Sequence, residues 1–196
     1  MVADLHLGKV GHFRKSGIPL PKAMEQEDLA TLSDLIREHR PETLLILGDF
    51  FHSTYNEDWA WIRLWRGQFP DLKLILVKGN HDILKLEVFE SLGMKIYPEK
   101  YILDPFVFTH IPREKVENEE GYFISGHLHP GISIKGRGHQ SRRLPCFYFT
   151  DSFAILPAFG HFTGSSKLPV NKKSKIFIIN GKTVIPFANE PQDYDL

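Results

Sequence analysis

Five short polar motifs, each placed after an apolar run, constrain the fold of this chain more than any other feature. The motifs are Asp4-Leu5-His6, Gly48-Asp49-Phe50-Phe51-His52, Gly79-Asn80-His81-Asp82, Thr109-His110 and Gly126-His127-Leu128-His129. They contain six of the ten histidines of the chain, together with carboxylates and one amide. Ligands of this mixed kind are typical of a hydrolase with two metal ions rather than of a structural metal site.

The apolar runs in the first half predict buried strands. Residues 43–47 and 72–77 are nearly continuous apolar segments that stop at two of the polar motifs, as expected of strands buried on both faces. Residues 59–65 carry apolar side chains at helical spacing, and a helix is also expected over residues 22–40. This alternation favours an α/β fold of sheets flanked by helices. In such sheets ligands bind beyond the carboxyl ends of the strands.

The sequence pattern of the second half of the chain predicts short strands separated by turns. Strands are expected over residues 106–109, 122–125, 132–134, 146–150, 153–156, 175–179 and 183–187. Asn180-Gly181 between the last two predicts a hairpin with a type I′ turn. The length fits one domain covering residues 1–196.

The N-terminus departs from this pattern. Only Met1, Val2 and Ala3 precede the first motif, whereas a buried strand usually needs ~4–8 residues. We therefore expect the N-terminal strand to be truncated to a stub.

Composition narrows the possible partners and the cell compartment. The formal net charge is zero, so no general field attracts nucleic acid and any DNA binding must use a local basic patch. Cys146 is the single cysteine, which excludes an intramolecular disulfide and is compatible with a cytoplasmic location. No apolar run approaches the ~20 residues of a membrane span.

The five motifs, in this order, resemble those of the calcineurin-like metallophosphoesterases. The resemblance implies a four-layer α-β-β-α sandwich and two divalent ions. It assigns the first ion to Asp4, His6, Asp49 and His129, and the second to Asp49, Asn80, His110 and His127. Asp49 would bridge both ions. Manganese is the metal we expect, and iron or zinc would also suit mixed nitrogen and oxygen ligands.

The same resemblance assigns two catalytic residues, His81 and His52, and a third, Asp82, is expected from its place next to His81. His81 follows the ligand Asn80, and in this superfamily that imidazole protonates or stabilises the leaving group. Asp82 is expected to orient His81, because a histidine usually donates its second N–H to an acceptor. His52, three residues after the bridging aspartate, resembles a histidine of the nuclease branch that helps to hold the substrate phosphate.

Further segments resemble the bacterial ligase-associated DNA damage response endonucleases. They are residues 3–9, 12–14, 17–21, 124–131, 144–147, 156–160 and 162–164. The resemblance implies a DNA repair endonuclease that acts on single-stranded or damaged DNA, with a DNA ligase, a helicase and an exonuclease as partners.

Two basic clusters agree with a DNA substrate. One follows the first motif and the other follows the last. We expect DNA phosphate contacts from Arg14, Arg137, Arg142 and Arg143. An ordinary solvated surface is the competing interpretation of both clusters.

Three other functions remain open from the sequence. They are a phosphodiesterase for a small molecule or cyclic nucleotide, a phosphoprotein phosphatase, and a non-catalytic scaffold of the same fold. The presence of His81 argues against the scaffold. Trp59, Trp61 and Trp65 are a candidate partner surface, although core packing is expected for two of them. His39 is expected on a helix surface, whereas His12, His139 and His161 have no assigned role.

Overall fold

The computed structural model describes residues 1–19, 23–52, 54–113, 121–135, 141–161, 163–171 and 173–187. The helices in these ranges are α1 (Lys9–Lys15), α2 (Ala23–His39), α3 (Asp58–Gly67) and α4 (Leu86–Glu90). The strands are β1 (Thr43–Leu47), β2 (Lys73–Val77), β3 (Met94–Tyr97), β4 (Lys100–Leu103), β5 (Phe106–Thr109), β6 (Tyr122–Ser125), β7 (Gly131–Lys135), β8 (Ser141–Phe149), β9 (Phe153–Ile155), β10 (Lys175–Asn180) and β11 (Thr183–Phe187). None of these helices is long and apolar enough to cross a membrane.

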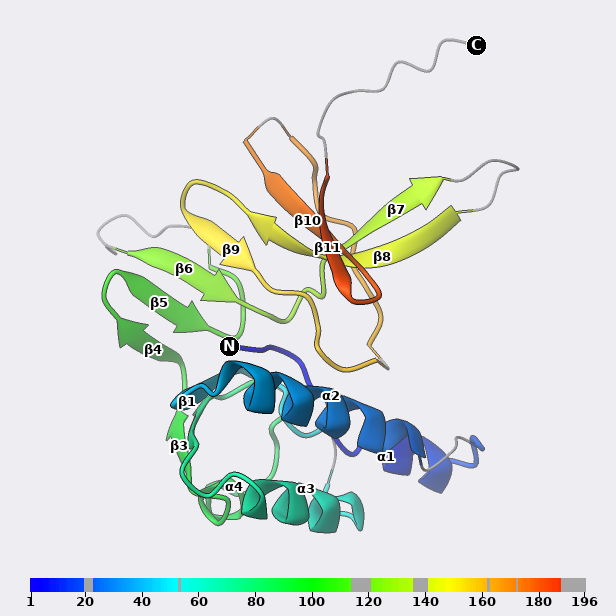
Figure 1. The fold of residues 1–196 in the computed structure, drawn as a ribbon, viewed down its shortest axis with the longest axis vertical. Coiled ribbons are helices and arrows are strands. Elements are labelled where there is room, and N and C mark those ends of the chain that lie inside the picture. The colour runs from blue at the N-terminus through cyan, green and yellow to red at the C-terminus, as the bar shows by residue number, and fades with distance from the viewer. Residues whose placement is uncertain are drawn as a thin grey trace.

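A small parallel sheet with the order β1-β2-β3 is covered by helices on one face (Figure 1). Leu44 and Ile46 of β1 pack in one core cluster with apolar residues of α2, α3 and β2. Trp59 and Trp65 of α3 are buried in this cluster, as expected, whereas Trp61 is exposed. The helical spacing of the tryptophans therefore serves mainly to attach α3 to the sheet.

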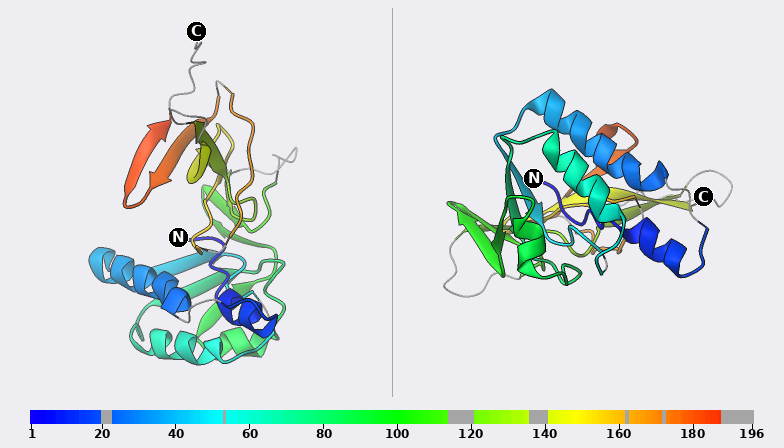
Figure 2. Two further views of the ribbon diagram at one scale, coloured as in Figure 1. Left: turned by 90° about the vertical axis from the view of Figure 1, so that its right-hand side faces the viewer. Right: turned by 90° about the horizontal axis from the view of Figure 1, so that it is seen from below.

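The opposite face of the small sheet packs against a larger sheet with the order β11-β10-β8-β9-β6-β5-β4, in which β7 pairs with β8. Leu45 and Leu47, which alternate with the helix-facing residues of β1, contribute to a second core cluster with Phe108 of β5 and Ile124 of β6. Figure 2 shows the helices in one half of the molecule and β6 to β11 in the other. The continuous apolar run of β1 is thus explained by burial on both faces.

The N-terminal segment pairs with β1 only through isolated bridges. Val2 pairs with Ile46 and Leu7 pairs with Phe51, both in parallel orientation. The Val2 N–H donates to the Leu45 carbonyl at 2.9 Å. This segment lies between the helical half and the larger sheet (Figure 1), and its pairing matches the expected stub.

The two-sheet α/β architecture is confirmed, with three differences in detail. Within the described ranges α2, α3 and α4 contribute to the core cluster of the small sheet, and the clusters of the larger sheet contain no helical residue, so a helical layer over the larger sheet is not seen there. The elements α1, α4, β3 and β4 were not predicted. The predicted turn type is wrong: Asn180 pairs with Thr183, so Gly181 and Lys182 form the turn. Of these two, only Gly181 has a positive φ, 60°, whereas a type I′ turn requires it at both positions.

Candidate metal centre

The seven predicted metal ligands all follow strands whose carboxyl ends meet at one edge of the two sheets. Asp4 and His6 follow the N-terminal stub, Asp49 follows β1, Asn80 follows β2, His110 follows β5, and His127 and His129 follow β6. The strands β1 and β2 are parallel to each other, as are β5 and β6. Because parallel strands end at the same edge, motifs far apart in the sequence come together.

Six of these residues form two compact groups in the described part of the chain. Asp4, His6 and His129 form one group, which we call the first ligand group; Asp49, His110 and His127 form the other, the second ligand group. In each group the candidate ligand atoms lie within 4.8 Å of one another. Each group can therefore hold one metal ion.

The first ligand group contains polar atoms that lack hydrogen-bond partners. Asp4 Oδ1, His6 Nε2 and His129 Nε2 are buried, and within the described residues none of them makes a hydrogen bond. His129 Nε2 lies 3.3 Å from Asp4 Oδ1, and its Nδ1 donates to the Gly164 carbonyl at 3.1 Å. Buried polar atoms are costly unless they are satisfied. A cation between these atoms would satisfy all three.

In the second ligand group, atoms that carry lone pairs face one another. His110 Nδ1 lies 2.9 Å from the Leu47 carbonyl, so this nitrogen carries the proton and Nε2 keeps its lone pair. That Nε2 faces two further acceptors, the Asn80 Oδ1 at 2.9 Å and the Asp49 Oδ1 at 3.4 Å. His127 Nδ1 lies 3.1 Å away. Acceptors that face acceptors fit a divalent cation, and Asn80 completes this group.

Asp49 lies between the two groups. Its Oδ2 is 3.5 Å from His6 Nε2, and its Oδ1 is 3.4 Å from His110 Nε2. The carboxylate also accepts the backbone N–H of His81 at 2.9 Å. One oxygen is thus directed to each group, which is the arrangement that a bridging ligand requires.

The backbone of the site is strained at its ligands. Six described residues other than glycine have a positive φ, and five of them are ligand candidates: Asp4 (55°), His6 (49°), Asp49 (51°), His127 (69°) and His129 (47°). This left-handed region is uncommon for residues with a Cβ, and strain of this kind clusters at functional sites. The turns after the strands direct these side chains inward.

Close packing of the strand ends explains two glycines. A Cβ at Gly48 would overlap the His110 ring, and a Cβ at Gly79 would overlap the Asp49 carboxylate and its backbone nitrogen. Glycine at these two positions lets neighbouring groups approach the backbone closely. In the structure the close approach is to the ligand side chains.

The electrostatics favour a neutral imidazole at His6 and at His127, whereas at His129 the Asp4 carboxylate raises the pKa against the lowering effect of burial. Burial, followed by the charge of Lys9, lowers the pKa of His6 to about 2. Burial, followed by the neighbouring His110, lowers the pKa of His127. A histidine must be neutral to bind a metal, so both side chains are prepared for that role.

Comparison with known proteins agrees with this geometry. The family description that matches the sequence, over residues 1–193, is calcineurin-like phosphoesterase. The chain belongs to this family. It is similar to the crystal structure of Pseudomonas putida nuclease MPE, with a TM-score of 0.76, 30% identity, and 95% of this chain and 85% of that chain covered.

A phosphoesterase from E. coli, YfcE, is 15% identical with a TM-score of 0.42, over 97% of this chain and 92% of that chain. This likeness is too low to carry an argument. A search of curated proteins gave no match. The family and its nuclease relative establish the chain as a metal-dependent phosphoesterase.

In this phosphoesterase, His52 and His81 lie side by side next to the first ligand group. Their ring centroids are 4.7 Å apart, and the rings of both lie about 5 Å from that of His6, at 5.1 and 5.2 Å. His52 Nδ1 lies 3.1 Å from His6 Nδ1. When His6 uses Nε2 as a ligand, its Nδ1–H can donate to His52. His12 joins the same cluster, with its ring 5.8 Å from that of His52, a contact without a signal in the sequence.

Asp82 makes contacts different from those expected. Its carboxylate accepts the backbone N–H of Phe51 at 3.1 Å and that of Gly79 at 2.8 Å, and no hydrogen bond to His81 occurs among the described residues. Burial raises the pKa of the Asp82 carboxyl to about 6, against the lowering effect of these N–H donors. Asp82 therefore ties together the loops that follow β1 and β2, and it positions Asp49 and Asn80 rather than His81.

Replacing Asp82 is expected to destabilise the fold. Asp82→Ala leaves two buried N–H groups without an acceptor, which should lower the free energy of unfolding by about 2–4 kcal/mol. Urea denaturation measures this loss, with the exposed Asp71→Ala as the control. An Asp82→Ala protein as stable as the parent but inactive would instead support the orienting role expected from the sequence.

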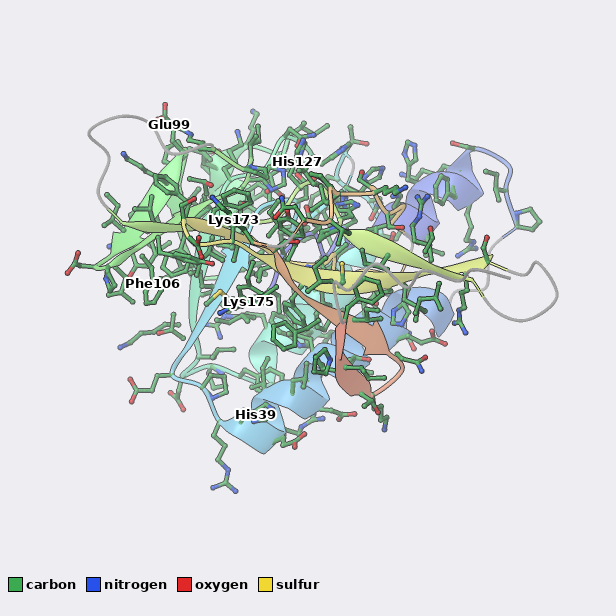
Figure 3. All side chains as sticks on the ribbon, turned by 90° about the horizontal axis from the view of Figure 1, so that it is seen from above. His39, Glu99, Phe106, His127, Lys173 and Lys175 are labelled. Atoms are coloured by element: carbon green, nitrogen blue, oxygen red, sulfur yellow. The ribbon has the colours of Figure 1, made fainter. Side chains whose placement is uncertain are left out.

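The predicted DNA-contacting arginines fall into three cases. Arg14 on α1 and Arg142 on β8 are exposed, and α1 and the β7–β8 hairpin lie on the same side of the molecule in Figures 1 and 3. Arg143 donates to the Ser165 carbonyl at 2.8 Å, so its guanidinium helps to hold the hairpin. Arg137 lies outside the described residues.

The remaining histidines are separate from the ligand groups. His39 is exposed at the end of α2, and Figure 3 shows it on the opposite side of the molecule from His127. His161 pairs through Nδ1 with the buried carboxylate of Asp28. His139 lies outside the described residues.

Proposed function

We propose that this phosphoesterase is a DNA endonuclease with two divalent ions, most suitably manganese, and that it works in DNA repair. The observation that carries the proposal is the pair of adjoining ligand groups joined by Asp49, with His52 and His81 beside them. Two ions held close together supply a hydroxide at neutral pH and neutralise charge on the phosphoryl oxygens.

The residues of the site have separate roles in the proposed reaction. The first ion would be held by Asp4, His6, Asp49 and His129, and the second by Asp49, Asn80, His110 and His127. His52 donates a hydrogen bond from Nε2 to a phosphoryl oxygen, because its Nδ1 is occupied by His6. His81 protonates the leaving alkoxide, since it lies beside His52 and belongs to neither ligand group.

Nuclease assays with each metal test the proposal. We expect manganese-dependent cleavage of circular single-stranded DNA, which has no end and therefore distinguishes an endonuclease from an exonuclease. Linear single-stranded and duplex DNA are compared in the same assay, and a cyclic nucleotide serves as the control substrate. Rapid hydrolysis of the cyclic nucleotide without DNA cleavage would favour a small-molecule phosphodiesterase.

The exposed arginines provide a quantitative test of the DNA substrate. Arg14→Ala and Arg142→Ala should each weaken DNA binding and flatten its dependence on salt by about one unit of slope, because each removes one phosphate contact. Arg63→Ala, an exposed arginine on α3, is the control. A small chromogenic diester is too short to reach these side chains, so its hydrolysis is the internal reference. Unchanged salt slopes in both variants would remove the basic-patch argument.

The repair role extends to partners and location. We propose that the protein acts in the cytoplasm with a DNA ligase, a helicase and an exonuclease, as the resemblance to the ligase-associated endonucleases implies. Deletion of the gene in its source organism, followed by a measurement of survival after DNA damage, tests this role. Full survival of the deletion strain would contradict it.

A further inference from the structure

A groove of about 440 Å³ adjoins the second ligand group. Asn80 and His110, which belong to that group, contribute to its lining. So do Ile83 and Ile111, which follow the His81 and His110 motifs closely in the sequence. The volume falls in the range of ~300–1,000 Å³ that is usual for small-molecule sites. The groove is therefore large enough for a nucleoside and opens directly onto the ligands.

Ile83 and Ile111 are large apolar side chains that are exposed to solvent beside the polar residues of the site. Ile83 is 63% exposed and Ile111 is 54% exposed, although each lies within three residues of a candidate ligand or catalytic histidine. Large exposed apolar side chains grouped around a polar centre mark a binding surface. A flat apolar ligand would cover both side chains.

The charged groups of the groove suit a phosphate next to that apolar ligand. Lys78, which is half-buried, and Arg113, which is exposed, both line it. Within the described residues neither side chain forms an ion pair or a side-chain hydrogen bond. The acidic residues of the lining are Glu99 and Asp82, and the Asp82 carboxylate is occupied by backbone N–H groups. In Figure 3 Glu99 and His127 lie on the same side of the molecule.

We propose that this groove binds the nucleoside adjoining the scissile phosphate, with its base between Ile83 and Ile111 and the next phosphate near Lys78 and Arg113. The inference rests on the proposed DNA substrate. It adds that the base must be unstacked to enter the groove, because a base inside a duplex presents its faces only to its neighbours. Single-stranded or distorted DNA is therefore the substrate that the groove accepts.

Small esters with one leaving group test the groove apart from DNA. The substrates are the p-nitrophenyl esters of thymidine 5′-phosphate and thymidine 3′-phosphate, compared with methyl p-nitrophenyl phosphate, which has no base. We expect kcat/KM for one thymidine ester to exceed that of the methyl ester at least tenfold, a ratio set by about 1.4 kcal/mol of additional binding.

Substitution of the isoleucines should reduce this ratio. Ile83→Ala and Ile111→Ala should each lower the ratio severalfold, toward the value of one expected without contact with the base, since each removes apolar contact. Ile185→Ala, an exposed isoleucine of β11, is the matched control and should leave the ratio unchanged. Calorimetric titration with thymidine 5′- and 3′-monophosphate measures binding without turnover. The same two isoleucine variants should bind these nucleotides more weakly.

The outcomes separate the groove from the DNA substrate. No preference for either thymidine ester, or a preference that survives both isoleucine substitutions, would overturn the groove assignment. A wild-type protein that prefers a thymidine ester but does not cleave DNA would support the groove and contradict the DNA endonuclease. DNA cleavage without a preference for either thymidine ester would support the DNA endonuclease and contradict the groove assignment.

Discussion

Asp49→Asn is expected to abolish most of the phosphoesterase activity and to lower the number of bound ions below two. Asp49 directs one oxygen to each ligand group, at 3.5 Å from His6 Nε2 and 3.4 Å from His110 Nε2. The substitution removes the negative charge between two divalent cations, which then repel each other without compensation. The amide is nearly the same size, so the change is one of charge rather than of volume.

Elemental analysis at saturating manganese measures this loss beside an activity assay. Asp71→Asn, an exposed aspartate between α3 and β2, is the control and should keep two ions and full activity. The urea midpoint of each protein shows whether the fold is intact. An Asp49→Asn protein that still binds two ions and turns over at the parental rate would exclude the bridging role.

Strands β1 and β2 of the small sheet could be predicted because most of their residues are buried. β1 buries Leu44 and Ile46 against the helices, and Leu45 and Leu47 against the larger sheet. Such a strand has a continuous apolar run that few other structures produce. The short strands β3 and β4 are mixed in burial, so their sequences carry no clear period and they were missed.

The residues that meet in the two ligand groups could also be predicted, but the geometry of these groups could not. The order of the polar motifs and their position after apolar runs are properties of the sequence. The left-handed backbone at His6 and His127 is not, because a positive φ is uncommon for any residue other than glycine, including the enriched asparagine, aspartate and histidine. Such conformations depend on contacts with segments remote in the sequence.

The role of Asp82 shows the same limit. In the sequence it follows His81 directly, and this adjacency suggested that the two side chains interact. In the structure its partners are the N–H groups of Phe51 and Gly79, one of which is 31 residues away. The pairing of His52 with His81 and the groove beside Asn80 likewise arise where the ends of separate strands meet.

His81→Ala is expected to retain both ions but to lower the rate of DNA cleavage by ~10²–10⁴, the usual range for a positioned acid or base. The His81 ring lies 4.7 Å from that of His52 and 5.2 Å from that of His6, yet it belongs to neither ligand group. The loss should be much smaller for a p-nitrophenyl ester, because p-nitrophenolate leaves without protonation whereas the alkoxide of DNA does not.

Metal analysis and the two substrates together identify the role of His81. The control is His39→Ala, since His39 is exposed and lies on the opposite side of the molecule from His127 (Figure 3). Loss of an ion from His81→Ala would make His81 a ligand. Equal losses for DNA and for the p-nitrophenyl ester would mean that His81 binds the phosphate rather than protonating the leaving group. Full activity on DNA would show that the leaving alkoxide receives its proton from another donor, and His52, whose ring lies closest to His81 among the described ring contacts, would be the next residue to replace.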